Sequence, residues 1–142
     1  MASRLNPYVN VLDGKAREAL EFYRSVFGGE LNVMTFGDMG TEGPLASQVM
    51  HGQLETQAGY TLMVADAPPE MMAVTVGTNI SISLSGGPED ADLLHGYFDA
   101  LSDGGQVAQP LEAAPWGDAF GMVVDQYGIS WMVNIAGEGN AG

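Results

Sequence analysis

Cysteine is missing from this 142-residue chain, and basic residues are scarce. Without cysteine, the protein cannot form disulfides, thiolate nucleophiles or zinc–thiolate centres. Four Lys and Arg residues stand against 18 Asp and Glu residues, which gives a formal net charge of −14. A surface with this charge repels nucleic acid and anionic membranes, so we expect neither as a partner. It could attract a cationic small molecule, although solubility is the simpler reason for the charge.

Long apolar runs are also missing. None approaches the roughly 20 residues that a membrane-spanning helix needs, and the N-terminal MASRLNPYVNV lacks the apolar core of a signal peptide. Apolar residues make up 46% of the chain and charged residues 15%, a composition typical of folded globular proteins. We therefore expect a soluble, cytoplasmic protein with one compact domain, or two half-domains that share a core.

The first half of the chain predicts a strand, a helix and three further strands. The helix spans Ala16–Phe27, where apolar residues recur every three or four positions. Asp13 is its predicted N-cap and Gly28-Gly29 its end, because glycine adopts the left-handed conformation without penalty. The strands are predicted at Pro7–Leu12, Glu30–Phe36, Ser47–Thr56 and Tyr60–Asp66.

The second half predicts the same order of elements. Serines alternate strictly with Ile80, Ile82 and Leu84, which indicates a half-buried strand with its apolar face against a helix. That helix opens at Gly87–Asp90, where a proline lies in the first turn. Its apolar stripe is Leu94, Phe98 and Leu101, and the strands that follow are Gln106–Leu111, Ala119–Val124 and Ile129–Val133.

Two observations indicate a duplicated half-domain. Gly104-Gly105 follows Gly28-Gly29 by 76 residues at the equivalent place in the order β-α-β-β-β. Each half has one helix, which can cover only one face of a four-stranded sheet, so the other face must line a cleft or a dimer contact. By alternation in the last strand, Trp131 faces the helix and Met132 faces the open side.

In three segments the sequence resembles the vicinal oxygen chelate superfamily, which has the glyoxalase/bleomycin-resistance/dioxygenase fold, and within it the PhnB-like proteins. The segments are Pro7–Leu31, Met50–Asp66 (MHGQLETQAGYTLMVAD) and Trp116–Asn134 (WGDAFGMVVDQYGISWMVN). The resemblance implies an α+β fold of two tandem βαβββ modules, at about 5–66 and 78–136. A linker at about 67–77 would join them within one domain of residues 1–142. Their sheets would curl into an eight-stranded cup with the helices outside, and the chain would form a homodimer.

Enzymes of that superfamily hold a divalent metal in the cup with four side chains, one on each of four strands. The matching positions here are Tyr8, His51, Asn79 and Met132. Only His51 is a good ligand for a divalent ion, so we expect no cofactor and an incomplete metal site. A divalent metal stays an open alternative, because strand alternation puts Glu55 on the same face as His51, Gln53 and Val49.

The predicted function is the binding of a small organic molecule in the cup. The predicted ligand-binding residues are Tyr8, His51, Asn79, Ser81, Trp116 and Met132, and no catalytic residue can be named. A structural role for His51, as a hydrogen-bonded residue that lines the cup, is a better explanation than the role of a catalytic base. An apolar cavity could be lined by methionines and aromatic residues, although core packing explains such residues equally well and is preferred for Trp131. The candidates are Met63, Met71, Met72, Met122, Met132, Trp116, Phe120 and Trp131. The alternatives are a metal-dependent lyase, isomerase or dioxygenase, and a dimeric interaction module without a ligand.

Overall fold

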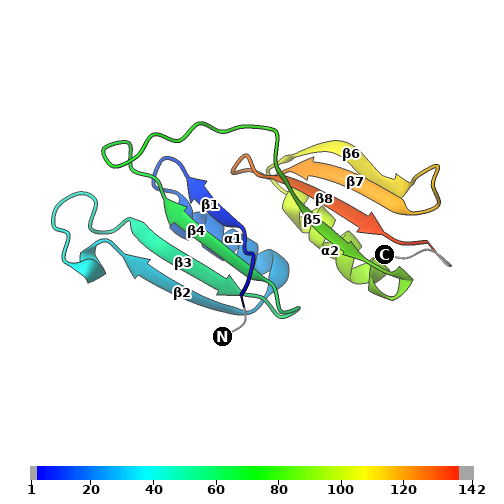
Figure 1. Cartoon of the computed structure of the whole chain (residues 1–142), viewed down its shortest axis with the longest axis horizontal. Helices are drawn as coiled ribbons and strands as arrows, with labels where there is room; N and C mark the ends of the chain where they lie inside the picture. The colour runs from blue at the N-terminus through cyan, green and yellow to red at the C-terminus, as the bar shows by residue number, and fades with distance from the viewer. Residues whose placement is uncertain (1–2, 138–142) are drawn as a thin grey trace. The chain divides into compact units, whose positions relative to one another are not determined.

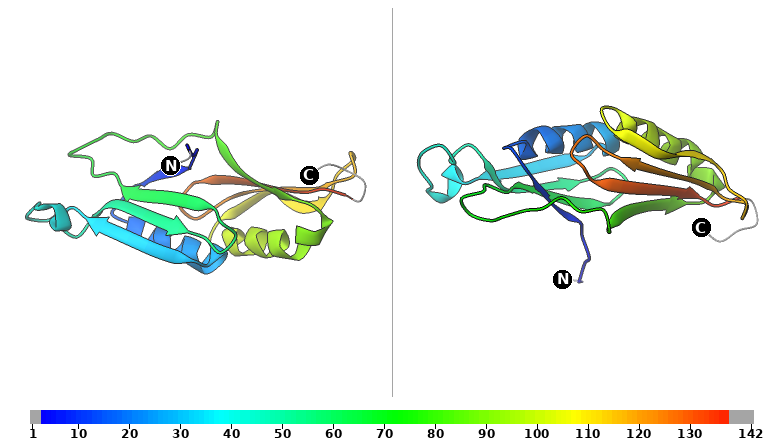
Figure 2. Two further views of the ribbon diagram at one scale, coloured as in Figure 1. Left: turned by 60° about the horizontal axis from the view of Figure 1, so that its bottom comes forward. Right: turned by 90° about the horizontal axis from the view of Figure 1, so that it is seen from above.

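The computed structural model describes residues 3–137 and divides the chain into two compact units. Unit 1 is Met1–Thr75 and unit 2 is Val76–Gly142. Each unit is a four-stranded sheet with one α-helix against one of its faces, as Figures 1 and 2 show. The prediction of an α+β fold with two tandem βαβββ modules is therefore confirmed. The cup that the resemblance implies stays a prediction.

Unit 1 contains the elements in the predicted order. They are β1 (Tyr8–Val11), α1 (Ala16–Phe27), β2 (Glu30–Thr35), a 3₁₀ turn η1 (Gly37–Met39), β3 (Val49–Glu55) and β4 (Thr61–Asp66). The strands lie in the order β1-β4-β3-β2. β1 pairs with β4 in parallel, and the other pairs are antiparallel. The helix has the predicted bounds because its apolar stripe is long and regular.

The core of unit 1 lies between α1 and the sheet. Leu20 and Tyr23 of α1 are fully buried, as are Leu54 of β3 and Val64 of β4. Gly52 lies on the same face of β3, and a Cβ atom there would clash with Leu20 Cδ1. Glycine at this position therefore lets the helix approach the sheet closely.

The first turn of α1 is not capped as the sequence predicts. Asp13 is wrong as the N-cap: it has a φ of 62°, and Lys15 takes the N-cap position without a side-chain hydrogen bond. The carboxylate of Asp66, at the end of β4, instead accepts hydrogen bonds from Ala16 N at 3.0 Å and Val49 N at 2.7 Å. Asp66 is only 5% exposed, so one buried carboxylate connects the helix start to two strands.

Unit 2 repeats the arrangement. It contains β5 (Ser81–Gly86), a 3₁₀ turn η2 (Pro88–Asp90), α2 (Ala91–Ser102), β6 (Gln106–Ala113), β7 (Ala119–Val124) and β8 (Ser130–Ile135). The strand order is β5-β8-β7-β6, again with one parallel pair at the edge. Leu94, Phe98 and Leu101 of α2 are buried, as the predicted stripe requires.

Two predictions in unit 2 need correction. The segment from Pro88 to Asp90 forms a 3₁₀ turn, and the α-helix begins at Ala91. Ile80 lies before β5 and is 78% exposed, because pairing with β8 begins only at Ser81. Leu84 does face the helix layer and is 7% exposed. Within residues 3–137, no helix combines the length and apolar character needed to cross a membrane.

Candidate functional site

The face of the unit 1 sheet that α1 leaves uncovered carries Tyr8 and His51. A shift in the register between β2 and β3 decides which side chains reach it: Met34 pairs with His51 and Thr35 pairs with Val49, so Met50 is an extra residue. The prediction that Val49 shares the face of His51 is therefore wrong. Val49 is 1% exposed, with the core residues.

Tyr8 and His51 lie next to each other on this face. Their ring centroids are 5.7 Å apart and the ring planes meet at 39°. Tyr8 lies on the edge strand β1 and is 48% exposed, and His51 is partly buried on β3. The sheet thus brings together two residues separated by 43 positions in the sequence.

A chain of hydrogen bonds runs along β3 from His51. Gln53 Oε1 lies 3.4 Å from His51 Nε2, and Gln53 Nε2 donates to Glu55 Oε1 at 2.5 Å. Thr61 Oγ1 donates to Glu55 Oε2 at 2.8 Å, and Arg4 Nη1 donates to Thr61 Oγ1 at 3.3 Å. Glu55 therefore reaches His51 through Gln53. The hydrogen bonds from Thr61 and Gln53 lower the pKa of Glu55 below its usual value.

This hydrogen-bond chain favours one proton position on neutral His51. An ionised Glu55 can only accept, so the amide nitrogen of Gln53 must face it. The amide oxygen of Gln53 then faces His51 Nε2 at 3.4 Å and can only accept, which favours the proton on Nε2 of the neutral ring. In that tautomer, Nδ1 keeps the lone pair.

Residues 3–137 contain no cluster of metal ligands: no three His, Asp or Glu side chains converge there as a metal ion would require. His51 and Tyr8 lie in unit 1, whereas Asn79 and Met132 lie in unit 2. His51 therefore belongs to no such group of three ligands among the described residues.

The uncovered face of unit 2 is built from rows of paired residues. One row runs through Ser83, Met132, Met122 and Gln109, and the next runs through Ser85, Asn134, Phe120 and Glu112. Met132 is thus on the open side and Trp131 on the covered side, as predicted, since Trp131 is 2% exposed. Trp131 Nε1 also donates to the buried Asp125 at 2.8 Å.

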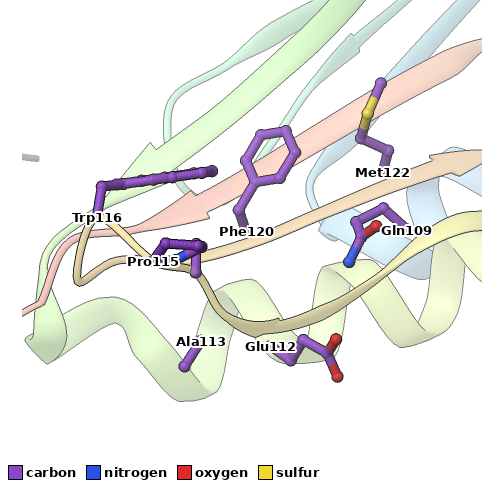
Figure 3. A pocket seen from close by; sticks show the side chains of 8 residues that line it. Gln109, Glu112, Ala113, Pro115, Trp116, Phe120 and Met122 are labelled. Carbon is purple, nitrogen blue, oxygen red and sulfur yellow. The ribbon is translucent and has the colours of Figure 1, made fainter.

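A hollow of about 400 Å³ opens where β6 and β7 meet their connecting loop (Figure 3). Its lining residues are Gln109, Glu112, Ala113, Ala114, Pro115, Trp116, Phe120 and Met122. Trp116 is 59% exposed, and its ring centroid lies 5.8 Å from that of Phe120 with the planes at 62°. In Figure 3, Trp116 is seen edge-on near Phe120, and Met122 lies further along β7.

The structure thus groups some of the predicted residues and separates others. Tyr8 and His51 meet in unit 1; Ser81 and Met132 belong to the open side of unit 2, and Trp116 lines the hollow. Asn79 is exposed and precedes β5, so it belongs to no strand. Sequence reasoning did not include Gln109 and Glu112, because the pairing of β6 with β7 is irregular there and simple alternation does not place them.

Comparisons with known proteins agree with this architecture. A family model described as 3-demethylubiquinone-9 3-methyltransferase matches residues 7–134. The crystal structure of protein PA1353 from Pseudomonas aeruginosa is 31% identical, with a TM-score of 0.81 over 96% of this chain and 100% of that chain.

Two further solved structures show the same fold at lower identity. A putative 3-demethylubiquinone-9 3-methyltransferase, PhnB protein, from Bacillus cereus is 24% identical, with a TM-score of 0.67 over 91% of this chain and 98% of that one. A glyoxylase/bleomycin resistance protein/dioxygenase domain from Frankia is 12% identical, with a TM-score of 0.65 over 99% and 96% of the two chains.

Proposed function

We propose a ligand-binding function for this chain, which belongs to the PhnB-like family described as 3-demethylubiquinone-9 3-methyltransferase, within the glyoxalase/bleomycin resistance/dioxygenase superfamily. The proposed ligand is a small organic molecule held on an uncovered sheet face, without a complete set of metal ligands.

The hollow of unit 2 is the observation that supports this function. Pockets for small organic ligands typically measure roughly 300–1,000 Å³ and combine apolar and aromatic walls with a few polar groups. The hollow has a volume of about 400 Å³, with Trp116, Phe120 and Met122 as apolar walls and Gln109 and Glu112 as polar groups. An indole that is 59% exposed beside a second aromatic ring provides a ready surface for a ligand.

Screening small organic compounds by thermal unfolding of the full chain tests the proposal. The set should contain neutral, cationic and anionic members. A compound at about 100 times its Kd stabilises the folded state by about 2.7 kcal/mol, so a true ligand raises Tm measurably. We expect at least one compound to raise Tm. If none of the compounds raises Tm, the proposal is wrong.

Two variants locate the ligand. Met122→Trp places a bulky side chain in the hollow and should abolish the stabilisation, while the fold persists because Met122 is on the uncovered face. Leu93→Trp is the matched control, since Leu93 is 45% exposed on α2. A ligand that still stabilises the Met122→Trp variant as strongly as the unchanged protein would show that the hollow is not its site.

Metal content separates this function from a metal-dependent lyase, isomerase or dioxygenase. Such enzymes need several ligands around one ion, whereas His51 is the only strong candidate among the matched positions. We expect no stoichiometric Zn, Ni, Mn or Fe in the dialysed protein by plasma mass spectrometry. About one metal ion per chain would favour the metal-dependent alternative.

A further inference from the structure

We propose that the hollow of unit 2 takes a flat organic cation, such as an N-alkylated aromatic ring. This inference rests on the proposed function, because it names the chemical class of the ligand at the same hollow. It depends on the charge of unit 2, on the side chains of the hollow and on the angle between its two aromatic rings.

The two units differ sharply in charge. All four Lys and Arg residues of the chain, Arg4, Lys15, Arg17 and Arg24, lie in unit 1 with nine of the 18 acidic residues. Unit 2 holds the other nine acidic residues and no Lys or Arg. The formal charges are therefore −5 for unit 1 and −9 for unit 2, which together make the −14 of the chain. The field of unit 2 thus attracts cations and repels anions.

An anionic ligand would find no counter-charge in unit 2. Its one histidine, His95, lies on α2, which covers the opposite face of the sheet from the hollow. Carboxylates, phosphates and phosphonates are normally held by Arg, Lys or a metal ion. Glu112, which lines the hollow from β6, provides a negative charge instead.

The apolar walls favour an organic cation over an inorganic one. The face of an indole ring attracts cations, and Trp is the strongest aromatic residue in this respect. The thioether of Met122 is polarisable and adapts to ring edges. A hydrated metal ion would gain nothing from Trp116, Phe120 and Met122, since such ions need oxygen or nitrogen ligands.

The angle between the rings favours a flat molecule. Trp116 and Phe120 meet at 62° with centroids 5.8 Å apart, so a planar ring can stack on one of them while its edge meets the other. Figure 3 shows Gln109 and Glu112 on β6 and Phe120 and Met122 on the neighbouring β7, and in this view the Glu112 side chain points away from the two aromatic rings. Gln109 and Glu112 are the polar residues that line the hollow, so they are the groups available to the positive nitrogen of a stacked ring.

Nuclear magnetic resonance of the full ¹⁵N-labelled chain tests the proposal with three matched probes. They are the cation 1-methylquinolinium, its neutral analogue 1-methylnaphthalene and the anion naphthalene-1-sulfonate. The chain has two tryptophans, so two indole signals report the result. The cation should shift Trp116, whereas Trp131, which is buried and bonded to Asp125, stays unchanged as an internal reference.

The expected affinities follow from the charges. The cation should bind roughly tenfold more tightly than the neutral analogue, because both can stack on the rings but only the cation gains the cation–π attraction and the attraction of the carboxylate. Trp116→Leu should weaken cation binding by roughly tenfold, and Trp116 is exposed enough for the fold to persist. Glu112→Gln should weaken it by about threefold without affecting the neutral analogue.

Asp99→Asn is the control for general surface charge. It removes the same charge from unit 2, but Asp99 is exposed on α2, on the covered side of the sheet. An equal loss of affinity in Asp99→Asn and Glu112→Gln would overturn the site. Equal binding of 1-methylnaphthalene and the cation, or no shift of Trp116 with the cation, would overturn the ligand class. The thermal screen, with its Met122→Trp variant, decides separately whether the hollow binds any ligand.

Discussion

The covered faces of the two units are built alike. α1 and α2 each span 12 residues. Gly52 of β3 and Gly121 of β7 both lie under a helix side chain, Leu20 in one unit and Phe98 in the other. In each case a Cβ atom would approach that side chain too closely, so the same device brings helix and sheet together in both units.

The uncovered faces differ. Unit 1 has a series of hydrogen-bonded polar side chains, His51, Gln53, Glu55 and Thr61, and the Tyr8 ring lies next to the ring of His51. Unit 2 has an aromatic hollow with methionines beside it and no Lys or Arg anywhere in its sequence. Packing constrains the covered faces because both layers must interdigitate, whereas the uncovered faces are free to diverge chemically. One scaffold thus presents two different surfaces.

Equivalent turns offer the strongest test of this comparison. Thr56–Tyr60 and Asp125–Ile129 join the last two strands of their units, each with glycine at its fourth position. Asp125 is 3% exposed and accepts hydrogen bonds from Tyr127 N, Ile129 N and Trp131 Nε1. Asp125→Ala should cost about 3–5 kcal/mol, because it removes the acceptor of one buried and two part-buried donors.

The matched change in unit 1 should cost less. Thr56 Oγ1 accepts one hydrogen bond, from Tyr60 N at 2.9 Å, so Thr56→Ala should cost about 1 kcal/mol. Native-state hydrogen exchange measures the free energy of opening for each unit separately. Equal costs for the two variants would show that Asp125 adds nothing beyond an ordinary turn residue.

The helix starts differ in a similar way. Asp66→Ala removes the acceptor of two buried amides, Ala16 N and Val49 N, and should destabilise unit 1 by about 2–4 kcal/mol. In unit 2, Asp90 precedes α2 without a side-chain capping bond, so Asp90→Ala should cost less than about 1 kcal/mol. Urea unfolding followed by far-ultraviolet circular dichroism checks both values. A larger loss in Asp90→Ala would reverse the comparison.

Local patterns predicted the helices and most strands well. α1 has the predicted bounds, since its apolar stripe is a property of neighbouring residues. The function of Asp66 was not predictable in this way, because its partner Ala16 lies 50 positions away. The extra residue at Met50 was also missed, and it reversed the expected side of Val49, since a bulge depends on the pairing partner.

The candidate site was predictable only in part. Alternation in a regular strand correctly places Met132 on the open face of the sheet and Trp131 on the covered face. The bridge from His51 to Glu55 depends on the conformation of Gln53, which strand geometry alone does not determine. The cup and the homodimer stay predictions, because each depends on contacts beyond those within a single unit. The ligand and the metal content also stay predictions.

The smallest expected effect concerns the proton on His51. If Glu55 orients Gln53, then neutral His51 should carry its proton on Nε2 to a greater extent than His95, which is exposed on α2. Long-range ¹H–¹⁵N correlation spectra at about pH 8.5, above the usual histidine pKa of ~6.5, distinguish the two nitrogens. The chain has two histidines, so each signal can be assigned with one variant.

Glu55→Gln should shift His51 toward the proton distribution of His95, because an amide at position 55 can also donate and lets Gln53 reverse. Glu30→Gln is the matched control: Glu30 pairs with Glu55 across β2 and β3, so this variant removes the same charge from the neighbouring position.

The pH dependence follows from Glu55. Hydrogen bonds from Thr61 and Gln53 lower the pKa of Glu55, so its ionised form stabilises the fold above the unfolded-state pKa. That contribution is lost as the pH falls through the lowered pKa of the folded state. The ionised Glu55 that orients Gln53 should therefore persist throughout the neutral and alkaline range. An equal change in Glu30→Gln would mean that charge, and not the hydrogen bond through Gln53, sets the proton position of neutral His51.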